Sequence, residues 1–119
     1  MFTVRVEADF SAAHHLTEFY GKCERLHGHN YKVRAYAAGT ELDKAGMLVD
    51  FGLLKGCLRT VLEGLDHSDL NALPELEDSP SAERIARYIF HAMLAREPGL
   101  PLTAVEVFET ATSMARYEP

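Results

Sequence analysis

Residues 2–14 of this chain read FTVRVEADFSAAH and residues 27–39 read HGHNYKVRAYAAG, and these two segments decide the fold. In each of them apolar and polar residues alternate, which is typical of a strand with one buried face. We therefore expect two long strands, each with an apolar side and a polar side.

Three histidines fall on the apolar sides of these strands. His14 ends the first segment, while His27 and His29 begin the second. If the strands pair as antiparallel neighbours, the end of the first lies beside the start of the second, and the three imidazoles share one face. Three neutral imidazoles make a zinc site with an open fourth position, which is usually catalytic. A single histidine on a strand usually packs in the core or lies on the surface. Three histidines on the same side of two neighbouring strands favour a metal site instead.

The loop between these segments carries Cys23 beside Lys22 and Arg25. Neighbouring cations or a metal lower the pKa of a thiol, so Cys23 is a candidate base or nucleophile. An incidental loop cysteine is the alternative, which composition leaves open. The other cysteine, Cys57, lies among leucines at helical spacing and is expected in the core.

Composition excludes several classes of protein. The chain has 119 residues and a formal net charge of −6, with no cluster of lysine and arginine, which argues against nucleic-acid binding. No apolar run is long enough for a transmembrane helix, and the start of the chain lacks a signal-peptide core. We expect one cytoplasmic domain over residues 1–119, with no membrane partner.

The remaining elements predict an α+β fold. A short extended segment at 47–49 precedes a helix over 53–65. A second helix begins after Ser79, with Pro80 at its first position, and ends before Pro98. Residues 102–117 predict two strands with a break near 109–112. The result is a four-stranded antiparallel sheet with two helices on one face. The two helices leave the other face of the sheet and its edges uncovered. We therefore expect another copy of the chain to pack there, which makes the protein a homo-oligomer.

Five motifs occur in this order along the chain: Phe10-Ser11-Ala12-Ala13-His14, Cys23-x-x-x-His27-Gly28-His29, Val49-Asp50-Phe51-x-x-Leu54-Lys55, Leu65-Asp66-His67-x-x-Leu70-Asn71 and Glu109-Thr110-Ala111-Thr112. Their order and spacing resemble the 6-pyruvoyl-tetrahydropterin synthase family from residue 2 to about residue 117. Within that family, the three residues between Cys23 and His27 resemble the bacterial 6-carboxytetrahydropterin synthases of queuosine biosynthesis.

This resemblance implies the T-fold, in which the sheets of neighbouring subunits close into a barrel, commonly as a dimer of trimers (a homohexamer). It implies Zn²⁺ on His14, His27 and His29, and active sites at subunit interfaces. The implied reaction is that of a carbon–carbon lyase. It converts the small molecule 7,8-dihydroneopterin triphosphate to 6-carboxy-5,6,7,8-tetrahydropterin, acetaldehyde and triphosphate.

The resemblance also implies roles for four further residues. Cys23 matches the general base, Asp66 and His67 match the pair that completes its proton relay, and Glu109 matches the carboxylate that anchors the pterin. Without the resemblance, Glu109 would be interpreted as a solvent-facing acid at a strand end. Asp66 and His67 would be interpreted as residues of a helix terminus.

Three alternative functions remain at this point. The first is the sister activity, a 6-pyruvoyl-tetrahydropterin synthase that eliminates triphosphate as a carbon–oxygen lyase. The second is a zinc hydrolase that uses the three histidines, and the third is a non-catalytic metal- or pterin-binding subunit.

Overall fold

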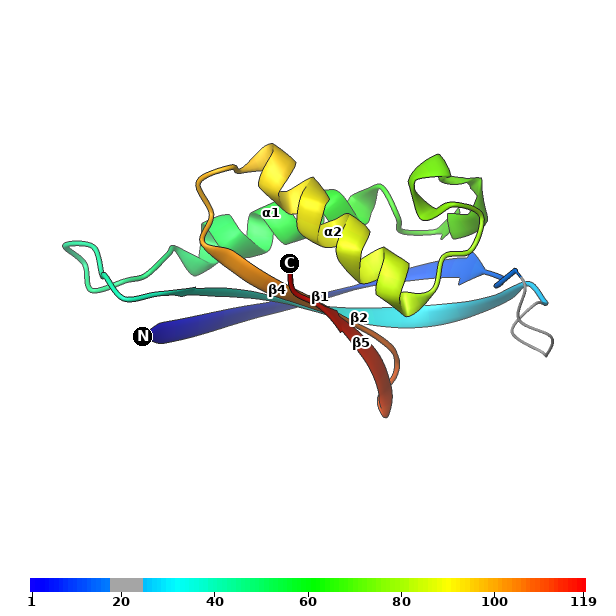
Figure 1. Cartoon of the computed structure of the whole chain (residues 1–119), viewed down its shortest axis with the longest axis horizontal. Coiled ribbons are helices and arrows are strands. Elements are labelled where there is room, and N and C mark those ends of the chain that lie inside the picture. Colours follow the sequence, from blue (N-terminus) through cyan, green and yellow to red (C-terminus); the bar gives the residue numbers. More distant parts are fainter. Residues whose placement is uncertain (18–24) are drawn as a thin grey trace.

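The computed structural model describes residues 1–17 and 25–119. Its element order is β1 (Phe2–His14), β2 (His27–Gly39), α1 (Phe51–Glu63), β3 (Ser68–Asp69), the 3₁₀ turns η2 (Leu70–Ala72) and η3 (Pro74–Leu76), α2 (Ala82–Arg96), β4 (Leu102–Thr110) and β5 (Ser113–Tyr117). Figure 1 shows both long helices on the same side of a twisted sheet.

The long hairpin of β1 and β2 is the centre of the sheet. The two strands pair antiparallel from Phe2 opposite Gly39 to His14 opposite His27, as the alternation predicts. The full strand order is β3-β1-β2-β4-β5, so the sheet has five strands rather than the expected four. The additional strand, β3, has only two residues and pairs in parallel with Ala12 and Ala13 of β1.

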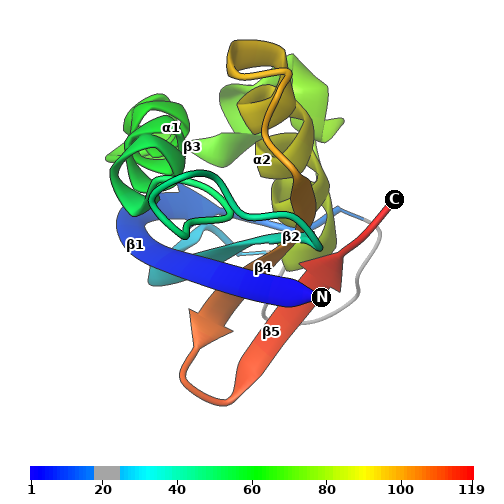
Figure 2. The same cartoon turned by 90° about the vertical axis from the view of Figure 1, so that its left-hand side faces the viewer.

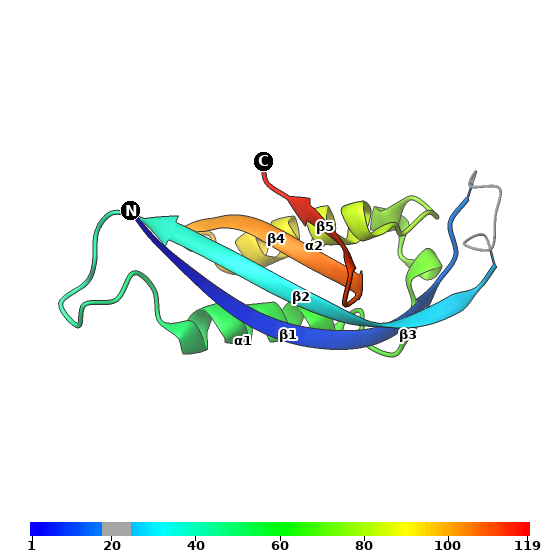
Figure 3. The ribbon, with the colours of Figure 1, turned by 90° about the horizontal axis from the view of Figure 1, so that it is seen from below.

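The core lies between the sheet and the two helices. The apolar positions of β2 are fully buried, and the apolar stripe of β1 ends at the buried His14. Both α1 and α2 are amphipathic and place their apolar residues on this layer. Viewed along the sheet, both helices cover one face (Figure 2), and in the view from below the sheet lies in front of the two helices, with no helix on the near face (Figure 3). The expected α+β arrangement is therefore confirmed.

Both helices begin at positions that differ from the prediction. Helix α1 begins at Phe51 because the side chain of Asp50 accepts a hydrogen bond from the backbone N–H of Gly52. Helix α2 begins at Ala82, since Ser81 rather than Ser79 is its N-cap and accepts from the N–H of Arg84 at 3.2 Å. Pro80 therefore lies before the helix, and its carbonyl oxygen is free to meet another group. Among the described residues, no helix is both long and apolar enough to cross a membrane.

Candidate functional site

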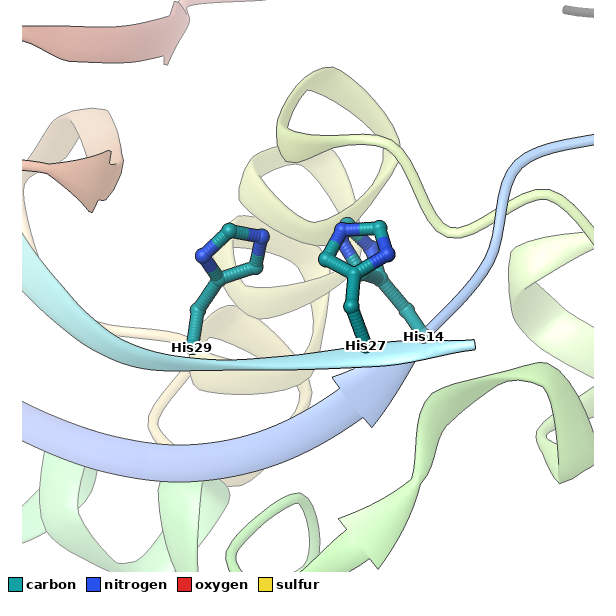
Figure 4. Close-up of side chains that lie close together, drawn as sticks. All are labelled: His14, His27 and His29. Atoms are coloured by element: carbon teal, nitrogen blue, oxygen red, sulfur yellow. The ribbon is translucent and has the colours of Figure 1, made fainter. Parts of the chain in front are cut away.

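The three histidines come together at the end of the β1–β2 hairpin. His14 lies directly opposite His27, and His29 lies two residues further along the same face of β2. One ring nitrogen from each lies within 4.8 Å of the other two. Figure 4 shows the three rings rising from the same side of the two strands. The parity of the two strands thus predicts the cluster correctly.

Backbone carbonyls fix the protonation of two of these rings. The Nδ1 atom of His14 lies 2.8 Å from the carbonyl oxygen of Pro80, and Nδ1 of His27 lies 2.7 Å from that of Arg25. A carbonyl oxygen only accepts, so each Nδ1 donates, and in the neutral rings each Nε2 then carries a lone pair. A carbonyl that orients a ring in this way is typical behind a metal-binding histidine.

The Nε2 atoms of the rings, which do not contact a carbonyl, face one another. The Nε2 atoms of His14 and His27 are 2.9 Å apart, and two lone pairs at that distance repel unless a proton or cation is shared between them. Nε2 of His29 is buried and has no hydrogen-bond partner in the described part of the chain. Ligand nitrogens around one tetrahedral zinc ion lie about 3.3 Å apart, so this donor set fits a metal ion.

Burial favours the neutral form of His14 and His29. Desolvation lowers the pKa of His14 and also lowers the pKa of His29, and in both cases this outweighs the opposing effect of the Glu109 carboxylate. Neutral imidazole is the form that binds a metal. Three nitrogen ligands leave one tetrahedral position open for another molecule.

Glu109 belongs to the same cluster. It lies near the end of β4, and its Oε1 is 3.9 Å from Nε2 of His14. Spacing along the sequence does not connect Glu109 with the histidines, because the connection depends on β4 pairing with β2. The structure therefore replaces the interpretation of Glu109 as an isolated strand-end acid with a carboxylate beside the histidine rings.

Asp66 and His67 form a separate pair. Nδ1 of His67 lies 2.9 Å from one carboxylate oxygen of Asp66, while the other oxygen accepts the backbone N–H of Ser11 at 2.9 Å. These contacts lower the pKa of Asp66, that of Ser11 being the larger. His67 has a φ of 54°, an unfavourable left-handed conformation, and its side chain is 83% exposed. The pair directly follows the C-terminus of α1, which ends at Glu63, and the backbone N–H of Asp66 still donates to the carbonyl oxygen of Leu62 at 2.9 Å.

The described chain does not bring His67 to the histidine cluster. His67 is one of the residues that line a shallow cavity of about 550 Å³ at the end of the hairpin, and His29 also lines it. Among the described residues, however, the candidate metal-binding group consists of His14, His27 and His29 without His67. Cys23, the remaining predicted residue, lies outside the described residues.

Two contributors to the site escape sequence reasoning. The carbonyl of Pro80 is a backbone group, so no residue type marks it as the partner of His14. The other is Tyr31, a fully buried residue whose ring centroid lies 5.3 Å from that of His29 and 5.8 Å from that of His14. Burial raises the pKa of Tyr31, and the charge of Glu109 raises it further. Its only signal in the sequence is a hydroxyl group on an otherwise apolar strand face.

Comparison with known proteins identifies relatives along nearly the whole chain. The family described as 6-pyruvoyl tetrahydropterin synthase matches residues 3–119. The chain is 44% identical to a 6-carboxy-5,6,7,8-tetrahydropterin synthase of Synechocystis sp., over 98% of this chain and 93% of the relative. It is 36% identical to the enzyme of that name from Bacillus subtilis, over 99% and 86%.

A solved structure of the same family has the same fold. The 6-pyruvoyl tetrahydropterin synthase of Caenorhabditis elegans superposes with a TM-score of 0.88 at 29% identity, covering 99% of this chain and 95% of that one. The expected T-fold of the single subunit is therefore confirmed, apart from the number of strands.

Proposed function

The chain belongs to the 6-pyruvoyl tetrahydropterin synthase family, and we propose that it converts 7,8-dihydroneopterin triphosphate and water to 6-carboxy-5,6,7,8-tetrahydropterin, acetaldehyde and triphosphate. The observation that carries this function is the 44% identity, over nearly both full lengths, to a relative named for that product. The reaction is that of a carbon–carbon lyase, and we propose it as a step of queuosine biosynthesis.

We assign zinc as the metal of the histidine cluster. Three neutral imidazoles with an open fourth position are a common catalytic zinc site, whereas calcium and magnesium prefer oxygen ligands. Bound there, zinc supplies a Lewis acid for the oxygen atoms of the substrate side chain. Two backbone carbonyls hold the rings in the orientation that zinc binding requires. The carbonyl of Pro80 accepts from Nδ1 of His14, and that of Arg25 accepts from Nδ1 of His27.

Glu109 anchors the pterin in this proposal. Its carboxylate can accept two parallel N–H bonds from the aminopyrimidinone edge, which fixes the orientation of the ring as well as its affinity. The distance of 3.9 Å between Oε1 of Glu109 and Nε2 of His14 supports the role, because a ring held by this carboxylate would lie next to a metal bound by His14. The side chain attached to that ring would then reach the open metal position.

Cys23 removes the proton from the substrate side chain, and Asp66 and His67 relay it. The hydrogen bond at 2.9 Å lets Asp66 hold His67 as the tautomer with a proton on Nδ1, which leaves Nε2 free to accept. His67 is 83% exposed and lies outside the group formed by His14, His27 and His29, so we propose that it serves the metal site of a neighbouring subunit. A cytoplasmic homo-oligomer built as a dimer of trimers provides such interfaces.

Product analysis tests the proposed reaction. Zinc-loaded protein incubated with 7,8-dihydroneopterin triphosphate is expected to release acetaldehyde together with triphosphate. Triphosphate with 6-pyruvoyl-tetrahydropterin and no acetaldehyde would assign the sister activity, which the likeness to the Caenorhabditis elegans structure makes the second candidate. No turnover of any dihydropterin that carries the side chain would contradict both.

Substitution of Cys23 separates the lyase from a zinc hydrolase. Cys23→Ala is expected to abolish turnover while the protein retains its zinc, because the thiol is needed as a base and not as a ligand. In a hydrolase the metal provides the nucleophile itself, so the same variant would keep most of its activity. Cys57→Ala is the matched control, since Cys57 is buried in the core.

A further inference from the structure

A buried tyrosine next to the histidine cluster has no hydrogen-bond partner. Tyr31 is fully buried, and its hydroxyl is one of two buried side-chain polar atoms that lack a partner in the described part of the chain. The other is Nε2 of His29, which a metal ion would satisfy. A buried hydroxyl that stays unpaired is unfavourable, so a partner for Tyr31 is expected in the working enzyme.

Strand pairing identifies the neighbours of Tyr31. On one side it lies opposite Phe10 of β1, and the two rings stack with centroids 4.8 Å apart. On the other side, β2 pairs with β4 so that Lys32 lies opposite Phe108. This is the last pair of the register, and Tyr31 and Glu109 are the next residues along their strands, at a point where the pairing of β4 with β5 is irregular. Both lie beside the same imidazole: the ring centroid of Tyr31 is 5.8 Å from that of His14, and Oε1 of Glu109 is 3.9 Å from Nε2 of His14.

The carboxylate of Glu109 has room for another donor. It has two oxygens with about four lone-pair positions, and the two parallel bonds from a pterin edge use one position on each oxygen. In the present structure Glu109 is turned toward Nε2 of His14 at 3.9 Å. A metal bound to that nitrogen takes up its lone pair, and the hydroxyl of Tyr31 is then the neighbouring donor without a partner.

We propose that Tyr31 is a positioning residue for Glu109, donating its hydroxyl hydrogen to the carboxylate when that carboxylate holds a pterin. The proposal rests on the role of Glu109 in the proposed function. It explains why a hydroxyl occurs at a fully buried position of an otherwise apolar strand face, where phenylalanine would pack equally well. Tyr31 acts through Glu109 and not on the reacting atoms.

Two matched substitutions on the same strand test this role. Tyr31→Phe removes a hydroxyl that has no partner without ligand, whereas Tyr36→Phe removes one that donates to the buried Glu106 at 2.6 Å. The measurements on zinc-loaded protein are the dissociation constant for pterin, followed by its fluorescence, and the unfolding temperature without ligand. KM and kcat with 7,8-dihydroneopterin triphosphate complete the set.

The two variants are expected to show opposite patterns. Tyr31→Phe should weaken pterin binding about tenfold and raise KM by a similar factor with little change in kcat, because a bond to a charged group is lost equally in substrate and transition state. Its unfolding temperature without ligand should not fall. Tyr36→Phe should lower the unfolding temperature and leave pterin binding unchanged.

A third variant, Glu109→Gln, links the effect to the carboxylate. In the Glu109→Gln background, Tyr31→Phe should change pterin binding much less than in the original protein, because the charged acceptor is gone. Unchanged pterin binding in Tyr31→Phe, or a loss of stability like that of Tyr36→Phe, would overturn the positioning role even if the enzyme turns over its substrate. Absence of turnover in the unmodified protein would instead contradict the proposed function.

Discussion

Replacing His29 by phenylalanine should separate metal binding from folding. Nε2 of His29 is buried without a partner among the described residues, so the substitution breaks no internal hydrogen bond at that atom. It also keeps a ring between those of His14 and Tyr31, whose centroids lie 5.1 and 5.3 Å away. Metal-free His29→Phe is therefore expected to be at least as stable as the original protein, and up to about 1–3 kcal/mol more stable.

The response to zinc should change in the opposite direction. Zinc at one thousand times its dissociation constant stabilises a folded protein by about 4 kcal/mol. For a chain of 119 residues this raises the unfolding temperature by about 16 °C, since 1 kcal/mol corresponds to about 4 °C at this size. The variant has lost one of three ligands and should show only a small part of that shift.

Thermal unfolding with a chelator and with added zinc measures both effects. His91→Phe is the control, because His91 lies on α2 and contacts the hydroxyl of Tyr117 at 3.1 Å instead of the cluster. A metal-free His29→Phe protein that is less stable than the original, combined with an unchanged shift of the unfolding temperature on adding zinc, would show that His29 supports the fold and does not bind the metal.

Three further predictions concern pH, the proton relay and the assembly. Metal-free protein should lose stability as the pH falls below about 6.5, because the unfolded chain then takes up protons that the buried His14 and His29, with their lowered pKa, do not. Unfolding followed by urea titration at pH 5 to 8 checks this, and a flat profile would contradict it. Asp66→Asn should lower kcat at least about tenfold without loss of zinc, because His67 loses the acceptor of its Nδ1 proton; equal loss of zinc and activity would indicate a structural role. Mixed oligomers of His29→Phe and His67→Ala should recover activity that neither variant has alone, and no recovery would place both residues in one subunit's site.

Much of the fold can be predicted from the alternation in two segments. A period of two places His14, His27 and His29 on the apolar faces of their strands, and the antiparallel pairing of those strands brings the three together. The break between the last two strands is also clear from the sequence. These features depend on local patterns and on one pairing between strands that follow each other.

Other features depend on contacts that no local pattern encodes. Strand β3 is too short for any periodicity, and it forms because the chain turns at His67, where φ is 54°, to pair with Ala12 and Ala13. The N-cap of α2 is chosen between two nearby serines by which hydroxyl reaches an N–H of the first turn. Glu109 reaches His14 only through the pairing of β4 with β2, across 95 residues of sequence separation, 109 minus 14.

The ratio of acetaldehyde to triphosphate distinguishes the proposed reaction from its sister activity. Zinc-loaded protein is incubated with 7,8-dihydroneopterin triphosphate, and both products are quantified in the same samples over time. The proposed reaction predicts that the two are released in equal amounts, and that neither appears with His29→Phe. Release of triphosphate without acetaldehyde, or equal activity in that variant, would contradict a zinc-dependent carbon–carbon lyase.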